Sequence, residues 1–312
     1  MRSSLSVIIV ATAIVLFSLW NYAGVKTDFA AHQGGYHYQQ MIRADSAPAP
    51  YCYRWLVPVL SFRVIGLAYF WMAIGIIGAG VGIHILTREL GGSSNAAWFA
   101  MLAFLLWTHI FMEPVLWFSV ADPVAWCSIV WAAIFGLRRR LVAAVVAISV
   151  GVLSRDLALI SIPFVLAVNK DQGRRLALLA VPVALWLAAI VLIHPSVAVI
   201  ANEDTLSIFK RFGAIHKIRA GGVLLSWSWF WKSFAVIGPL FAAGIAGVKD
   251  RRILLYLLVA GMVFLAGDSV RMVTFALACL FPVTGIGFER LVPVKYQVVA
   301  ATLLLGYHAV SF

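Results

Sequence analysis

Long apolar runs, separated by short polar or charged turns, follow one another along the whole chain. A helix needs about 20 apolar residues to cross the hydrocarbon core of a bilayer. The apolar residues run continuously instead of alternating with polar ones, which excludes the strands of an outer-membrane barrel. The pattern predicts about eleven membrane-spanning helices, some of them short, over residues 5–24, 66–87, 95–112, 121–137, 141–154, 157–169, 176–194, 227–247, 253–267, 272–288 and 295–311.

Composition points to the same class of protein. Of the 312 residues, 63% are hydrophobic and 12% are charged, whereas a soluble domain has about 45–50% apolar and about 25% charged residues. The chain is too apolar for a soluble enzyme and has too few polar tracts for a disordered protein. We therefore predict an all-α fold, a polytopic transmembrane helical bundle that forms a single integral membrane domain over residues 1–312.

The two shortest runs, 141–154 and 157–169, leave two interpretations open. They form either two short helices that meet at a turn over residues 154–156 or one long helix with a charged kink. If the chain returns at this turn, one face of the bundle collects the basic clusters that begin at Arg2, Arg138, Lys170 and Lys249. Cytoplasmic loops of membrane proteins are enriched in Lys and Arg. We therefore predict two short helices, an odd number of spans and a cytoplasmic N-terminus.

This topology places the two longest polar loops, 25–65 and 195–226, on the outer face of the membrane. The outer face then has 8 of the 12 acidic residues, and the cytoplasmic face has 13 of the 24 basic residues. The net charge of +12 follows from this bias in the loops, so it does not predict a nucleic-acid partner.

Four short groups of residues stand out at the outer ends of predicted helices, and all carry charge. Charges at the membrane edge are costly, so they usually pair, line a polar cavity or take part in function. The groups are Tyr53 with Arg54, Glu113 with Asp122, Arg155 with Asp156, and Asp268 with Arg271. A guanidinium presents a planar fork that suits phosphate oxygens. The three arginines together therefore predict an anion site, and a nearby carboxylate is a candidate base.

Each group also has a purely structural interpretation, which stays open. The acidic and basic members of a group neutralise one another when they lie within a helical turn. Glu113 and Asp122 cap the helices that they border, and Pro123 then takes the first helical position after Asp122. Tyr53 belongs to an ordinary aromatic belt, and Arg54 extends its side chain to the lipid headgroups.

The layout resembles that of bacterial polytopic glycosyltransferases of the GT-C type. The first outward loop has an early acid, Asp28, followed by a His- and Tyr-bearing stretch over residues 32–38. A Tyr-Arg-x-Leu-x-Pro element follows over residues 53–58, and a Gly-Asp-x-x-Arg turn over residues 267–271 precedes a late run. The first loop departs from the family pattern, because it lacks the usual pair of close acids: Asp28 and Asp45 lie far apart.

The resemblance implies a polyprenyl-phosphate-linked sugar as the donor substrate, with no separate cofactor. It implies that Asp28 is the catalytic base and that Arg54 and Arg271 bind the phosphate of the lipid carrier; the topology adds Arg155. The residues expected to support this site are Tyr53, Glu113, Asp122, Asp156 and Asp268. No metal is predicted, because a single carboxylate with scattered histidines does not form a hard-cation site.

The expected function is therefore a membrane transferase of the cell envelope. It moves a sugar from a polyprenyl-phosphate carrier to an acceptor at the extracytoplasmic face of the bacterial cytoplasmic (inner) membrane, with membrane lipid as its other partner. A transporter or flippase is a second hypothesis, because interrupted helices such as those of 141–169 often build transport sites. A polymerase or ligase acting on a lipid-linked saccharide, or a non-catalytic membrane subunit, also fits the sequence, which leaves the oligomeric state open.

Overall fold

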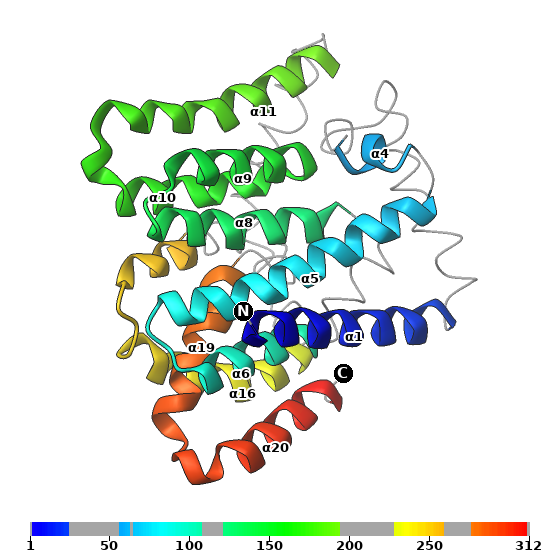
Figure 1. The fold of residues 1–312 in the computed structure, drawn as a ribbon, viewed down its shortest axis with the longest axis vertical. Helices are drawn as coiled ribbons and strands as arrows, with labels where there is room; N and C mark the ends of the chain where they lie inside the picture. The colour runs from blue at the N-terminus through cyan, green and yellow to red at the C-terminus, as the bar shows by residue number, and fades with distance from the viewer. Residues whose placement is uncertain are drawn as a thin grey trace, which may run out of the picture. The chain divides into compact units, whose positions relative to one another are not determined.

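The protein is described here by a computed structural model, which covers residues 2–24, 56–62, 65–107, 121–193, 228–258 and 276–310. Within these ranges every regular element is a helix and there is no strand, which confirms the predicted all-α class (Figure 1). The described elements are α1 (Arg2–Gly24), α4 (Leu56–Leu60), α5 (Ile65–Glu89), α6 (Ser94–Leu105), α8 (Asp122–Leu137), α9 (Leu141–Ser154), η3 (Asp156–Ile160), α10 (Ser161–Val168), η4 (Lys170–Leu179), α11 (Ala180–Ile193), α16 (Ser228–Ile245), η6 (Arg251–Leu254), α19 (Leu277–Leu291), η7 (Val294–Tyr296) and α20 (Gln297–Val310), where η marks a 3₁₀ helix.

Only some of the predicted spans correspond to helices that are both long enough and apolar enough to cross a membrane. In the described residues, one helix is long and apolar enough to cross a membrane, Leu67–Glu89. The segments Leu277–Leu291 and Val294–Tyr307 pass the test together, but the chain bends by 111° between them. The helices α8 and α9, with 16 and 14 residues, are about 21–24 Å long, which is less than the roughly 30 Å of hydrocarbon. The count of about eleven spans stays a prediction.

Internal contacts divide the chain into two compact units. The first unit comprises Met1–Gly82 and Thr108–Ser196, and the second comprises Ile83–Trp107 and Val197–Phe312. The boundary between the units falls inside the continuous helix α5. A single integral membrane domain stays a prediction, and each unit is described by itself below.

In the first unit, α8, α9 and α10 lie side by side (Figure 1). The chain leaves helical geometry at Arg155, whose backbone is extended (φ −160°, ψ 127°). It then returns through η3 and α10, so that the Asn169 side chain donates a hydrogen bond to the Gly136 carbonyl at the end of α8 (3.1 Å). Of the two interpretations of residues 141–169, the structure confirms the two short helices and excludes one long helix.

The helix α5 packs on α8 through small residues in the first unit. A Cβ added at Gly75 would lie 2.5 Å from the Pro123 backbone carbonyl carbon, and one added at Gly78 would lie 2.6 Å from the Cys127 sulfur. The Trp131 indole donates to the Gly78 carbonyl (3.1 Å). Small residues let helix backbones approach closely, which is a common way of packing helices in membranes.

The second unit is built around α19, which packs on α6 and α16. Phe99 of α6 and Phe288 of α19 stack with ring centroids 4.0 Å apart. At one end of this unit, the Glu289 carboxylate accepts a hydrogen bond from the Ser93 backbone N–H (2.8 Å), and the Lys249 N–H donates to the Leu90 carbonyl (3.0 Å). These contacts bring the end of α5, the turn after α16 and the last turn of α19 together, with Arg88, Lys249 and Arg290 among their residues.

Candidate functional site

A buried ion pair joins the beginning of α8 to the end of α9 in the first unit. An Nη1 nitrogen of Arg155 contacts an Oδ2 oxygen of Asp122. The two side chains are only 1% and 2% exposed, although charged residues are almost never fully buried unless they are paired. The two residues are 33 positions apart in the sequence, and the return of the chain between α8 and α9 brings them together.

Local backbone geometry positions both charges. Asp122 is the first residue of α8 and is followed by Pro123, a residue that the first turn of a helix tolerates because its missing N–H would be unsatisfied there anyway. Arg155 follows the last turn of α9, and its backbone N–H bonds to the Gly151 carbonyl (2.6 Å). A carboxylate at a helix N-terminus and a cation at a helix C-terminus each complement the helix dipole. The pair is therefore stabilised by both helices as well as by its own attraction.

The structure corrects two of the structural interpretations. The N-cap of α8 is Ala121, and no side chain caps the helix, so Asp122 does not act as a side-chain cap. Arg155 forms its ion pair with Asp122, from another helix, and not with the adjacent Asp156. Side chains of adjacent residues do not face each other even within a helix, and the extended backbone at Arg155 ends α9 there.

Further polar atoms lie buried on α8 and on η3 and α10, the two elements that follow α9. Asp122 Oδ1, Trp126 Nε1, Asp156 Oδ1 and Ser161 Oγ have no hydrogen-bond partner among the described residues. Trp126 is one helical turn after Asp122 on α8, and Ser161 begins α10 shortly after Asp156. An unpaired buried polar group costs about 1–3 kcal/mol. These elements therefore offer both donors and acceptors to a polar ligand.

The charge of this cluster sets what it can do. Asp122 and Arg155 neutralise one another, and Asp156 is the next acid along the chain. A guanidinium carries five N–H donors in a planar fork, which are enough to contact a carboxylate and a second anion. Arg155 can therefore serve a phosphate only by sharing its donors or by exchanging Asp122 for the phosphate.

The structure describes three of the nine predicted site residues and brings two of them into contact. Asp122 and Arg155 form the ion pair, and Asp156 follows Arg155 directly in the chain. The other six lie outside the described residues: Asp28, Tyr53, Arg54, Glu113, Asp268 and Arg271. Within the described ranges, no group of three or more His, Cys, Asp or Glu side chains is placed to hold a metal ion. The absence of a metal stays a prediction.

Sequence reasoning missed Trp126 and Ser161. Both are fully buried, and each carries a polar atom that lacks a partner in the described part of the chain. The spacing of four residues between Asp122 and Trp126 was a usable signal, because residues four apart share one face of a helix. Nothing comparable in the sequence points to Ser161, which begins α10 after the chain leaves α9 at Arg155.

Within the described residues, these features define an all-α protein in which one helix is long and apolar enough to cross a membrane and a buried charge pair lies at the turn after α9. Comparisons of the chain with protein-family models, with curated proteins and with solved structures found no match.

Proposed function

We propose that the chain is a multi-pass protein of the bacterial cytoplasmic membrane that transfers a sugar from a polyprenyl-phosphate carrier to an extracytoplasmic acceptor. The observation that carries this proposal is the buried Asp122–Arg155 pair, with Asp156 beside it. A charged cluster inside a strongly apolar chain is expensive, and such clusters usually mark a site of binding or chemistry.

The helices α8, α9 and α10, together called the α8–α10 hairpin, carry different charges at their two ends. These charges support an orientation of the hairpin in the membrane. Asp122 and Arg155 lie at one end, whereas the exposed pair of Arg139 and Asp171 (3.1 Å) lies at the other, next to the remaining basic residues of 138–140 and 170–175. Positively charged turns are retained in the cytoplasm. The polar cluster then faces outward, where the carrier presents its sugar to an external acceptor.

The proposed reaction is an inverting displacement at the anomeric carbon of the sugar. Asp28 takes the proton of the acceptor hydroxyl as its oxygen bonds to that carbon. The bond between the anomeric carbon and the phosphate oxygen breaks, and the polyprenyl phosphate leaves with the electron pair. Arg54 and Arg271 stabilise the negative charge that develops on the phosphate, as guanidinium groups do in anion sites.

Arg155 and Asp122 have a narrower role in this proposal. Asp122 holds the guanidinium in one orientation while no donor is bound. The carrier phosphate then competes with Asp122 for the same N–H donors, so Arg155 moves little when the donor arrives. A group that is oriented in advance contributes most to binding and to stabilising a transition state, because it needs no reorganisation.

The proposal is tested first by donor binding. The full chain is purified in mild detergent, and native mass spectrometry compares the wild type with Arg54→Ala and Arg271→Ala. We expect a bound polyprenyl phosphate or phospho-sugar that both variants lose. If no isoprenoid lipid is bound, or if all three proteins bind it equally, the two arginines are headgroup anchors and the donor site is refuted.

Transfer itself is tested with a matched pair of variants in the first loop. Asp28→Asn removes the proposed base, and Asp45→Asn removes the other acid of the same loop. A positioned general base contributes about 10²- to 10⁴-fold to the rate, so Asp28→Asn lowers turnover by that order while Asp45→Asn leaves it nearly unchanged. Full transfer activity in Asp28→Asn contradicts the assignment of this residue.

Transport of a lipid-linked or anionic solute is the second candidate function. It is favoured by the break in helical geometry at Arg155, between α9 and η3, because unwound helices line substrate sites in many transporters. A transporter moves its substrate across the bilayer without changing it. Reconstituted vesicles that accumulate chemically intact lipid-linked sugar, and form no product, would favour this function over transfer.

A further inference from the structure

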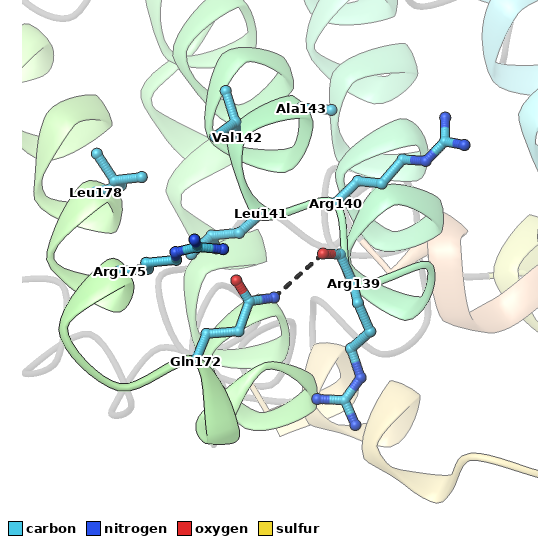
Figure 2. Close-up of a pocket in the computed structure, with 8 residues that line it drawn as sticks. All are labelled: Arg139, Arg140, Leu141, Val142, Ala143, Gln172, Arg175 and Leu178. Carbon is cyan, nitrogen blue, oxygen red and sulfur yellow. Dashed lines mark hydrogen bonds between the residues drawn. The ribbon is translucent and has the colours of Figure 1, made fainter.

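A hollow of about 540 Å³ lies at the other end of the hairpin from the Asp122–Arg155 pair, within the first unit. The turn before α9, the first turn of α9 and the 3₁₀ helix η4 surround it (Figure 2). Its polar lining comes from Arg139, Arg140, Gln172 and Arg175, and its apolar lining from Leu141, Val142, Ala143 and Leu178. One hollow thus combines a basic rim with an apolar wall.

The basic rim has charge available for an anion. The segments 138–140 and 170–175 contain six basic residues and one acid, Asp171. Asp171 pairs with Arg139, and no ion-pair partner of Arg140 or Arg175 is found among the described residues. Figure 2 shows the Arg175 side chain extending across the hollow, whereas the exposed side chains of Arg139 and Arg140 point away to other sides.

The apolar wall continues beyond the hollow as two exposed stripes. On α9, Val142, Val146 and Val150 follow at intervals of four residues and are 40–65% exposed. Along η4 and α11, Leu178, Val181 and Leu185 are 37–42% exposed. Residues at intervals of three or four share one helix face, and α9 and α11 pack against one another. Two apolar stripes therefore run from a single basic rim.

We infer that this hollow binds one anionic diacyl phospholipid. Arg175 binds the headgroup phosphate, Arg140 reaches it by rotating its exposed side chain, and the two acyl chains lie along the stripes of α9 and α11. Basic pockets between helices on the cytoplasmic side are suited to anionic headgroups. The inference rests on the proposed membrane placement, because that placement puts this end of the hairpin at the cytoplasmic leaflet; it does not depend on sugar transfer.

The binding test uses the full chain, purified in mild detergent and stripped of lipid. Native mass spectrometry follows its titration with phosphatidylglycerol, phosphatidylcholine, lysophosphatidylglycerol and inorganic phosphate. We expect phosphatidylglycerol to bind at least tenfold more tightly than phosphatidylcholine, because only its headgroup has a net negative charge. Lysophosphatidylglycerol, with one acyl chain, binds more weakly than phosphatidylglycerol. Inorganic phosphate does not displace phosphatidylglycerol.

Variants at neighbouring arginines locate the site. Arg175→Gln and Arg140→Gln each weaken phosphatidylglycerol binding by roughly fivefold, the effect of one basic residue near an anionic lipid. Arg174→Gln is the matched control, because Arg174 is adjacent and exposed but does not line the hollow. We expect this control to change binding by less than about twofold if only residues that line the hollow contact the headgroup.

Three results would overturn the inference. Equal binding of phosphatidylglycerol and phosphatidylcholine removes the charge selectivity. Equal effects of Arg174→Gln and Arg175→Gln show that binding follows overall charge and not the hollow. Displacement of the lipid by inorganic phosphate shows a small-anion site. A separate experiment tests the membrane placement: if alkaline carbonate releases the protein from membranes without detergent, the placement is wrong. If the protein does not transfer sugar, the lipid-binding result is unaffected.

Discussion

The buried pair of Asp122 and Arg155 makes a quantitative prediction about stability. Asp122→Asn keeps the size of the side chain but removes the charge that faces the guanidinium. Because the two side chains are 2% and 1% exposed, solvent cannot replace the lost interaction. Removing one partner of a buried pair typically costs about 3–5 kcal/mol. At roughly 2–4 °C per kcal/mol for a chain of moderate size, the apparent Tm falls by about 6–20 °C.

A double-mutant cycle separates the pair interaction from other effects of the substitutions. Arg155→Gln leaves the Asp122 charge buried, so it destabilises the protein to a similar extent. The double variant Asp122→Asn/Arg155→Gln has no buried charge at this position, so its loss of stability is smaller than the sum of the two single losses by about 2 kcal/mol or more. Thermal unfolding in detergent, followed by tryptophan fluorescence and by circular dichroism, measures all four proteins.

The exposed pair of Arg139 and Asp171 supplies the control in the same unit. Its side chains are 50% and 64% exposed, and pairs of this kind contribute about 0–1 kcal/mol. Asp171→Asn should therefore shift the apparent Tm by no more than a few degrees. If Asp122→Asn has no larger effect than Asp171→Asn, or if the cycle is additive, Asp122 and Arg155 do not form a buried, coupled pair.

Substitutions at four further positions test the packing and the backbone by the same thermal assay. Gly75→Ala should cost about 1–3 kcal/mol, because its Cβ would meet the backbone of α8. Gly78→Ala should cost less, because its Cβ would meet a cysteine side chain that can rotate. The reverse order of the two losses contradicts this packing. Gly173→Ala should cost about 1–3 kcal/mol, because the backbone angles there (φ 53°, ψ −126°) suit glycine. The cost comes from the backbone alone, because nothing lies within 4 Å of the added Cβ. Glu289→Ala should cost roughly 1–2 kcal/mol by removing the acceptor for a backbone N–H, whereas Glu289→Gln should restore most of it; equal losses contradict this role.

The ends of several helices could be predicted from the sequence because charged residues interrupt apolar runs sharply there. The run predicted over 121–137 matches α8 (Asp122–Leu137), and the run predicted over 141–154 coincides with α9. Three consecutive arginines separate these helices, and their desolvation inside an apolar core would be costly. The segment before α11 was less clear, because the 3₁₀ helix η4 begins at Lys170 and continues through Gly173 with non-helical backbone angles.

The candidate site was only partly accessible to the same reasoning. The sequence identified Asp122, Arg155 and Asp156 as charges at helix ends, but it could not select the partner of Arg155. A sequence-adjacent acid and an acid 33 positions away are equivalent until the path of the backbone is known. The boundary between the two units at Gly82, inside α5, could not be predicted from the sequence either, because the helical pattern continues across it without a break.

The apolar residues that the chain leaves exposed bear on where the protein works. In α9 the buried face includes Ala144, Val145 and Ile148, and the opposite face carries Val142 and Val146, which are 65% and 57% exposed. A helix on the surface of a water-soluble protein has a polar outer face, whereas a helix that is apolar all round belongs in a core or in a membrane. Among the described residues nothing covers the outer face of α9, so the core that these residues form does not account for it. Under the proposed membrane placement this face contacts hydrocarbon, an environment in which buried charges such as those of Asp122 and Arg155 are costly and usually functional.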